Sequence, residues 1–255
     1  MKKTIALSVL CAAMLCCAEA GAQLVIGGGF LNRNANVHTT MAYKDSSSVT
    51  KMGLGQGYYG GVTFNYDIWK GVGVALGTYY SYSKHEEKYT ETIGAWEYRY
   101  SAWYEQKELS IPLLATYRHE FFPEFYTTAY FGPVARIGLS VKGHKQRVGV
   151  DDVVDWEDDI DFYAKNDNGE SKWRKFDLGF MIGTGVQYYG ARFDIGYSLG
   201  LMERSNEGLV KLPDLNNAQA IDNAQIINHA RYESIIVGHF FVGLSYSFLN
   251  DIYNK

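Results

Sequence analysis

The sequence predicts an all-β protein: a transmembrane antiparallel up-and-down β-barrel of about eight strands, with long extracellular loops and short periplasmic turns. Apolar and small or polar residues alternate with period two over segments of about ten residues, the length that a tilted strand needs to cross a bilayer. After Ala22 no apolar run approaches the roughly 18 residues of a membrane-spanning helix. The 21 tyrosines and 27 glycines suit aromatic belts outside the barrel and small residues inside it.

The N-terminal segment has the three parts of an export signal. Lys2 and Lys3 form a basic start, and residues 4–17 form an apolar stretch without charge. Small residues then give two alternative cleavage patterns, one ending at Ala20 and the favoured one ending at Ala22. The mature chain is therefore expected to begin outside the cytoplasm.

The simplest division of the chain is a signal peptide over 1–22 and one outer-membrane β-barrel domain over 23–255. All three cysteines lie in the first segment, so we expect no disulfide although the mature chain enters an oxidising compartment. Cleavage removes two lysines and one glutamate, so the formal net charge of -4 becomes -5. This charge gives no sign of a nucleic-acid partner.

The first predicted hairpin shows the pattern well. Residues 24–33 supply the first strand, and residues 58–68 place Tyr58, Val62 and other apolar side chains on one face. Only three residues separate this second strand from the third, 72–83, so the two are expected to pair.

The fourth and fifth predicted strands, 108–117 and 129–140, keep the alternation but contain Pro112 and Pro133. Proline removes one ladder donor and is usually found at edges or bulges. We therefore expect a local bulge at each of these two positions.

The cleanest alternation follows in residues 176–188, where apolar side chains oppose glycine, aspartate and glutamine. A tight turn leads to 193–201, and the last strand is predicted over 235–248. Eight strands result, and ten are possible if the loops hold another pair.

Connections between these strands alternate in length. The short ones are 69–71, 118–125 and 189–191, and the long ones are 34–56, 84–97, 143–172 and 203–232. Outer-membrane barrels have this arrangement, with short turns in the periplasm and long loops outside the cell. Both termini are then expected in the periplasm.

A secreted soluble barrel of lipocalin type is the main alternative fold. In such a barrel large apolar residues point inward and charged residues cover the outside. Here the face opposite the apolar one is mostly glycine, serine and other small residues, which favours a membrane barrel. Eight strands enclose only their own side chains, so a general porin is not expected.

Several segments resemble the outer-membrane β-barrel domains that include PorT-like proteins. They cover most of the chain from Glu108 onward, and they are 108–114 (ELSIPLL), 130–133 (YFGP), 176–179 (FDLG) with Gly183 and Gly185, and 193–201 (FDIGYSLGL). The resemblance implies this fold and makes Pro112 a family trait. PorT-like proteins are linked to protein secretion across the outer membrane. The chain departs from the pattern at its end, where 249–255 extend beyond the terminal aromatic Phe248.

The resemblance implies a structural or accessory role in the envelope or in protein secretion. The alternative is a surface barrel that binds a ligand or host through its long loops. Expected partners are outer-membrane lipid, the barrel-assembly machinery during insertion, and secretion or envelope proteins.

Enzymatic and metal chemistry are not expected. No histidine stands in a spacing with serine and carboxylate that resembles a catalytic triad; the six are His38, His85, His119, His144, His229 and His239. An acidic run could offer oxygen ligands to calcium, but its spacing fails the calcium-loop pattern and predicts a solvated loop; it comprises Asp151, Asp152, Asp155, Glu157, Asp158, Asp159 and Asp161. We therefore predict no catalytic residue, no metal and no cofactor.

One candidate site lies inside the barrel. Glu108, Arg136 and Asp177 share the inward face of three consecutive predicted strands at similar heights. Buried charges are costly unless they are paired, so we expect Arg136 to bridge the two carboxylates as a structural plug. A proton or ion path is the functional alternative.

Two aromatic belts are expected on the outer face, about 25 Å apart. The periplasmic set is Tyr66, Trp69, Tyr117, Phe125, Tyr188, Tyr246 and Phe248, and the outer set is Tyr80, Tyr82, Tyr98, Tyr100 and Trp103.

Overall fold

A computed structural model describes residues 22–41, 46–93, 96–149, 154–165, 169, 171–204 and 231–248. The proposed signal peptide and residues 249–255 lie outside this set. The described strands are β1 (Ala22–Met41), β2 (Ser46–Trp69), β3 (Val72–Ile93), β4 (Trp96–Phe122), β5 (Phe125–Val148), β6 (Val154–Asp161), β7 (Phe176–Tyr188), β8 (Ala191–Gly200) and β9 (Arg231–Phe248).

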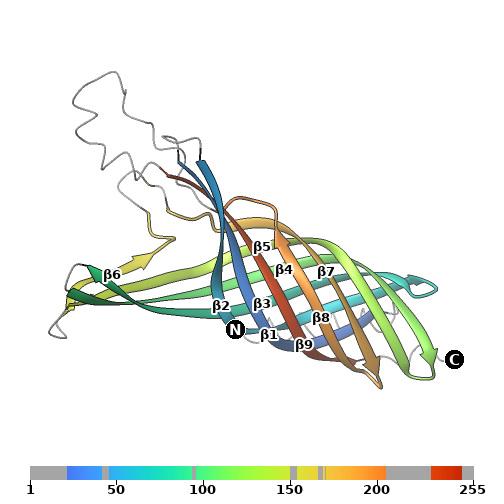
Figure 1. The fold of residues 1–255 in the computed structure, drawn as a ribbon. Helices are drawn as coiled ribbons and strands as arrows, with labels where there is room; N and C mark the ends of the chain where they lie inside the picture. The colour runs from blue at the N-terminus through green and yellow to red at the C-terminus, as the bar shows by residue number, and fades with distance from the viewer. Residues whose placement is uncertain are drawn as a thin grey trace, which may run out of the picture.

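Eight strands close into an antiparallel ring in the order β1-β2-β3-β4-β5-β7-β8-β9, and β9 pairs back with β1 (Figure 1). The predicted fold class is confirmed: the chain is all-β, with up-and-down strands in a closed barrel. β6 lies outside the ring and pairs with the far end of β5. Among the described residues, none belongs to a helix of the length and apolar character that spanning a membrane requires.

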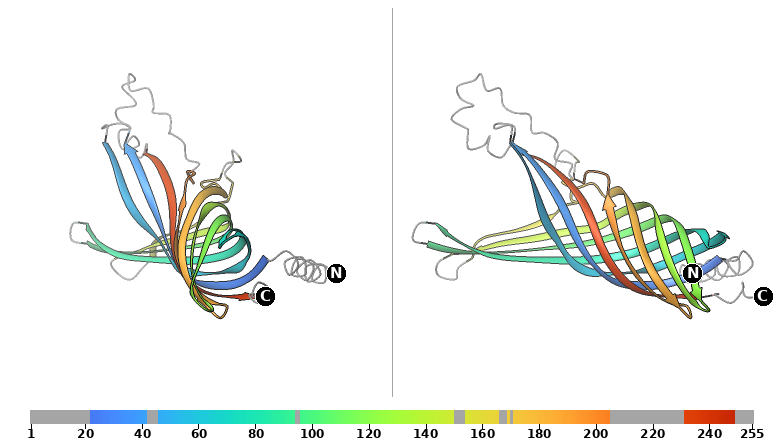
Figure 2. Two further views of the ribbon diagram at one scale, coloured as in Figure 1. Left: turned by 90° about the vertical axis from the view of Figure 1, so that its right-hand side faces the viewer. Right: turned by 45° about the vertical axis from the view of Figure 1, so that its right-hand side comes forward.

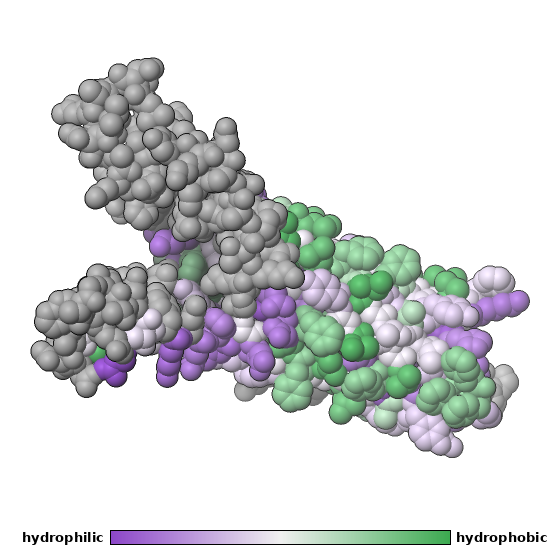
Figure 3. Space-filling view, viewed as in Figure 1, coloured by the Kyte–Doolittle hydropathy of each residue, from purple (hydrophilic) through white to green (hydrophobic). Residues whose placement is uncertain are grey.

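The predicted alternation of faces is observed in the barrel wall. Along β7 the apolar residues from Phe176 to Tyr188 are exposed, whereas Asp177, Gly179 and Gln187 are buried. Large apolar side chains are exposed on other strands too, including Phe30 and Leu244. Figure 3 shows these side chains in green over the barrel wall, with more hydrophilic residues over the strands that project from it. An outside of this kind suits contact with lipid rather than water.

Inward glycines make room for large side chains of neighbouring strands. A Cβ at Gly183 would overlap the ring of Tyr130, and a Cβ at Gly179 would overlap the Arg136 guanidinium. The small residues of the inner face therefore allow aromatic rings and arginines to lie across the narrow lumen.

The strands are longer than the sequence pattern predicts. β4 has 27 residues and β2 and β5 have 24 each, against the roughly 9 to 11 that cross a bilayer. The segments 34–56 and 84–97, which we expected to be loops, are therefore mostly strand, and β6 lies within the expected loop 143–172. Outside the membrane a strand needs no apolar face, so the alternation fades there while cross-strand hydrogen bonds continue.

These extensions divide into two sheets beyond the ring. The β2–β3 ladder ends at Gln56↔Lys84, and the β8–β9 ladder ends at Leu199↔Gly238. From there β1, β2 and β9 continue as one sheet, and β3, β4, β5 and β6 continue as another. Figure 2 shows the two sheets splaying apart from the barrel. We call them the β1–β2–β9 flap and the β3–β6 flap.

The acidic run that we expected to be a solvated loop is partly strand. Its residues in β6 pair with a basic stretch of β5, as in Lys142↔Asp161 and His144↔Asp159. Opposite charges across an antiparallel pair stabilise it, which explains why this segment extends the sheet. Residues 151–153 lie outside the described set.

The prolines do not produce the bulges that we expected. Pro112↔Val134 and Ala115↔Phe131 keep one register on β4 and β5, and Pro133↔Phe180 is in register on β5 and β7. A missing N–H removes a hydrogen bond without adding a residue, so the register persists. The β4–β5 shifts lie instead at Lys107/Glu108 and Glu120/Phe122.

The barrel end with short turns carries exposed aromatic side chains. Most residues of the expected periplasmic set are between 43% and 66% exposed, namely Tyr66, Trp69, Tyr117, Tyr188, Tyr246 and Phe248. Phe125 is partly buried against Phe122. Of the outer set, Tyr80 is exposed and Tyr82 and Trp103 are partly buried, whereas the side chains of Tyr98 and Tyr100 lie outside the description.

Candidate functional site in the barrel lumen

Six charged or titratable side chains meet inside the ring, although they come from six separate places in the chain. We call them the lumen cluster: Arg33 of β1, Glu108 of β4, Arg136 of β5, Asp177 of β7, Arg204 after β8 and His239 of β9. The arginines and carboxylates are 0% exposed and His239 is 6% exposed. Strand alternation points the strand residues inward. Arg33, Glu108, Arg136 and Asp177 each lie between exposed or partly exposed neighbours, and His239 precedes the exposed Phe240.

Arg204 makes the bridge that we expected from Arg136. Its Nη2 lies 2.5 Å from Glu108 Oε2 and 3.5 Å from Asp177 Oδ2. Arg136 Nη2 lies 3.5 Å from Asp177 Oδ2, while Glu108 has Arg33 as its second partner at 3.6 Å. The three predicted residues therefore share one cluster, and a different arginine joins the two carboxylates.

His239 accepts hydrogen bonds inside this cluster. Arg33 Nε donates to His239 Nε2 over 3.1 Å, and Arg136 Nη1 lies 3.4 Å from the same nitrogen. Two guanidinium donors aimed at Nε2 require a lone pair there, so we assign His239 as neutral with its proton on Nδ1. Arg33 also donates to Ser83 and Ser81, at 3.0 and 3.1 Å.

Sequence reasoning missed half of this cluster for identifiable reasons. Arg33 lies at the edge of its predicted strand, and from sequence we consider His239 only as a candidate for a catalytic triad. Arg204 lies beyond the end of β8 at Gly200, where the alternation of a strand no longer predicts the direction of a side chain. It is fixed instead by backbone bonds: Arg174 N donates to Arg204 O, and Leu201 N donates to Leu178 O, both over 2.8 Å.

A cap of apolar residues lies beside the cluster at the end away from the short turns. Tyr163 and Trp173 pack with Val141 and Val237. Gly138 N of β5 donates a hydrogen bond to Lys175 O over 2.6 Å, which holds the segment that contains Trp173 against β5. A Cβ at Gly138, the cross-strand partner of Glu108, would overlap the Tyr163 hydroxyl. The cap and the cluster together close the lumen at this end.

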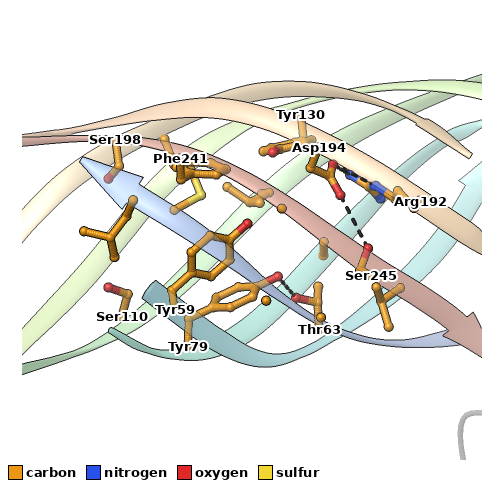
Figure 4. A pocket seen from close by; sticks show the side chains of 18 of the residues that line it. Tyr59, Thr63, Tyr79, Ser110, Tyr130, Arg192, Asp194, Ser198, Phe241 and Ser245 are labelled. Carbon is orange, nitrogen blue, oxygen red and sulfur yellow. Dashed lines mark hydrogen bonds and ion pairs between the residues drawn. The ribbon is translucent and has the colours of Figure 1, made fainter. Parts of the chain in front are cut away.

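On the other side of the cluster lies a cavity of about 100 Å³ (Figure 4). Its wall is largely apolar and aromatic, with Tyr59, Tyr79, Tyr130, Phe241 and Met181 among the lining residues. Tyr59 packs edge-on against both Tyr79 and Phe241, with ring centroids 5.9 and 5.8 Å apart. The lumen is therefore filled near the cluster and hollow below it.

Two further ion pairs lie between this cavity and the short turns. Arg192 binds Asp194 through Nε and Nη2, at 2.8 and 2.6 Å, and Arg118 Nη2 lies 2.6 Å from Asp67 Oδ2. A smaller cavity of about 20 Å³ lies between the two pairs and is lined by residues of both.

No catalytic arrangement emerges from the described side chains. Ser198 is the cross-strand partner of His239, but its hydroxyl has no hydrogen-bond partner, so no base activates it. His144 lies outside the barrel, where it binds Asp159. Within the described residues no group of three histidine, cysteine, aspartate or glutamate side chains could hold a metal.

The sequence matches the family model described as outer membrane protein beta-barrel domain over residues 20–205. The chain belongs to this family. It is accordingly an integral outer-membrane β-barrel, which agrees with the apolar outer face of the ring.

Solved structures of small outer-membrane barrels are similar to this family member at low identity. OprG from Pseudomonas aeruginosa is 13% identical, with 89% of this chain and 96% of that chain covered and a TM-score of 0.39. Neisserial surface protein A is 13% identical, with coverages of 88% and 97% and a TM-score of 0.34. The attachment invasion locus protein Ail of Yersinia pestis, in complex with the heparin analogue sucrose octasulfate, is 10% identical, with coverages of 89% and 99% and a TM-score of 0.32. No protein of curated function matches the sequence.

Proposed function

We propose that this barrel binds a ligand at the cell surface through its projecting flaps, and that the lumen cluster is a structural plug. The observation that carries the proposal is the length of the strands beyond the ring. The β3–β4 ladder continues from Lys84↔Glu105 to Ile93↔Trp96, which at roughly 3.3 Å per residue is about 30 Å. A barrel with a purely structural role in the membrane would not require strands that extend so far beyond the ring.

Side chains near the base of the β3–β6 flap hold one another in place. Trp103 of β4 stacks on His144 of β5, with ring centroids 5.9 Å apart, and Lys84 Nζ lies 5.7 Å from the Trp103 ring centroid. His144 Nδ1 lies 2.8 Å from Asp159 of β6. Such mutual contacts reduce the entropy that a surface loses on binding, which favours recognition of a ligand.

The proposal includes an orientation. Short turns, the start of β1 and the end of β9 all lie at one end of the ring, and the flaps lie at the other. We place the first end in the periplasm, as is usual for outer-membrane barrels, with insertion by the barrel-assembly machinery and removal of residues 1–22. The flaps then face the outside of the cell.

A PorT-like accessory role in secretion stays a prediction from the sequence resemblance. The closed lumen argues against passage of a polypeptide through this barrel, because the cluster and the cap fill its cross-section. Any such role would depend on contacts made by the outside of the barrel or by its periplasmic end.

Trimming the β3–β6 flap tests the surface-binding proposal. Since Glu86 pairs with Trp103, replacing residues 87–102 by Asn-Gly should close the hairpin with a two-residue turn and leave the ring intact. The matched control replaces Lys70-Gly71, a turn with two positive φ angles at the other end, by Asn-Gly.

Cells that display each variant would be tested for adherence to immobilised host glycans and matrix proteins. We expect at least one ligand that is bound by the parent and the control but not by the trimmed variant. Identical adherence of all three, or adherence of none, would count against surface binding. A photo-crosslinker at Glu120 that captured secretion proteins would instead favour the accessory role.

A further inference from the structure

We propose that the cavity beneath the lumen cluster binds a small carboxylate with a short aliphatic tail, entering from the short-turn end. This site is separate from the flaps, so it stands or falls independently of the proposed surface function.

Among the side chains that the structure describes, the charges of the lumen cluster are unbalanced. Arg33, Arg136 and Arg204 carry three positive charges, whereas Glu108 and Asp177 carry two negative ones and His239 is neutral. The other lumen pairs, Arg192–Asp194 and Arg118–Asp67, are each neutral. One positive charge is therefore left over in a place where hydration is lost, and a monoanion beside the cluster would balance it.

A buried donor without a partner stands where such an anion would bind. Ser198 Oγ is buried, lines the cavity and has no hydrogen-bond partner (Figure 4). His239, its cross-strand partner, also lines the cavity, and its assigned proton is on Nδ1. In the cluster beside the cavity, Arg136 Nε also lacks a hydrogen-bond partner, although Arg136 does not line the cavity itself. A carboxylate at Ser198 and His239 would satisfy donors that are otherwise buried at a cost.

The rest of the cavity suits a short hydrocarbon tail. Tyr59 and Tyr79 lie across its centre and Phe241 lies near Ser198, while Ala75 and Leu114 complete the apolar wall. A dry apolar cavity of about 150 Å³ is known to hold benzene. With about 100 Å³, this cavity fits a molecule no larger than benzene, such as an acid of about three or four carbons.

We place the entrance to the cavity at the short-turn end. At the flap end the described side chains of the cluster and the cap are buried, whereas the second cavity shares Asn65, Thr116, Tyr130 and Arg192 with the first. Beyond it the Arg118 and Asp67 side chains are 21% and 24% exposed. Rotation of this partly solvated pair would open a route from the short-turn end.

A series of straight-chain acids tests the proposal on the refolded mature barrel in detergent micelles, with ¹³C-methyl-labelled acetate, propionate, butyrate and hexanoate followed by NMR. Affinity should rise about fourfold with each methylene up to butyrate, because each becomes buried, and should fall for hexanoate, which exceeds the cavity. Butyramide and butylammonium should bind at least tenfold more weakly than butyrate, since neither supplies a negative charge.

Three variants locate the site. Ser198→Ala should weaken butyrate binding about tenfold, as expected for loss of a hydrogen bond to a charged group. Ala75→Leu should abolish binding by filling the cavity. Ser101→Ala, on β4 in the β3–β6 flap and away from the cavity, is the matched control and should change affinity less than twofold.

Each contrary result overturns the proposal. Chloride or formate binding as tightly as butyrate would mean an anion hole without tail recognition. Absence of saturable binding for the whole series would mean that the cavity holds only water. Binding that survives Ala75→Leu, in a barrel that still shows the folded gel band, would place the acid in the micelle.

Discussion

Glu108→Gln is the substitution that should disturb the charge balance of the lumen cluster most. It removes the carboxylate that Arg204 and Arg33 share, at 2.5 and 3.6 Å, and leaves three buried guanidiniums with Asp177 alone. Removing one partner of a buried ion pair costs about 3–5 kcal/mol, because the remaining charge stays dehydrated. We expect a loss of that size in the free energy of unfolding, which for many barrels would be a large part of the total.

Arg204→Met should lower the free energy of unfolding less than Glu108→Gln does, because two arginines then face two carboxylates in the cluster. The double variant should be more stable than Glu108→Gln alone, with a coupling of at least about 1 kcal/mol in the double-mutant cycle. Urea unfolding of the refolded barrel, followed by the gel shift between heated and unheated samples, measures both quantities.

The control for this series is Glu105→Gln, on the same strand but in the partly exposed Glu105–Lys107 pair. It should leave the unfolding midpoint almost unchanged, since solvent screens such pairs. If Glu108→Gln costs no more than Glu105→Gln, the cluster does not stabilise the barrel and our account of the plug is wrong.

Three other substitutions test the wall and the cluster. Arg136→Ala should lower the temperature at which the folded gel band disappears, by less than Glu108→Gln does, because Asp177 keeps Arg204; an unchanged temperature would refute a stabilising role for Arg136. Ile182→Arg, on the exposed face of β7, should destabilise the barrel in bilayers by about 2–4 kcal/mol, and a neutral effect on urea unfolding in vesicles would mean that this face does not meet lipid. Gly183→Val should prevent refolding, since its side chain would occupy the position of the Tyr130 ring; full recovery of the folded band would contradict the packing described for the lumen.

The barrel wall could be predicted from sequence because lipid imposes a strict rule on it. Every second residue of β7 and β8 must be apolar where the wall meets hydrocarbon, so period two is visible in one sequence. Beyond the bilayer this rule ends. The outer halves of β3 and β4 alternate weakly, and only the paired backbone reveals that they are strands.

The lumen cluster was predicted in part for a similar reason. Glu108, Arg136 and Asp177 lie within clear strands, so counting residues from the turns brought them to one level. Arg204 comes after the last residue of β8 and reaches the lumen through irregular backbone, where no period applies. Its partner Glu108 is 96 residues away in the chain, so only closure of the ring brings the two side chains together.

The cavity could not be predicted from sequence at all. Its lining residues come from β1 to β5 and from β7 to β9, and its size depends on which rings fill the inner face at each level. Alternation with the outward-facing Tyr58 and Phe131 places Tyr59 and Tyr130 on the inward face, but the space that they leave depends on side-chain packing.

The most direct test of the account is which end of the barrel faces the outside of the cell. Single cysteines at Lys88 in the β3–β6 flap and at Glu120 near the short turns would each be labelled in intact cells with a membrane-impermeant maleimide; the native cysteines all lie in residues 1–22. We predict rapid labelling at position 88 and labelling at position 120 only after the outer membrane is permeabilised. The reverse pattern, or equal labelling at both positions in intact cells, would contradict a barrel that presents its flaps at the cell surface.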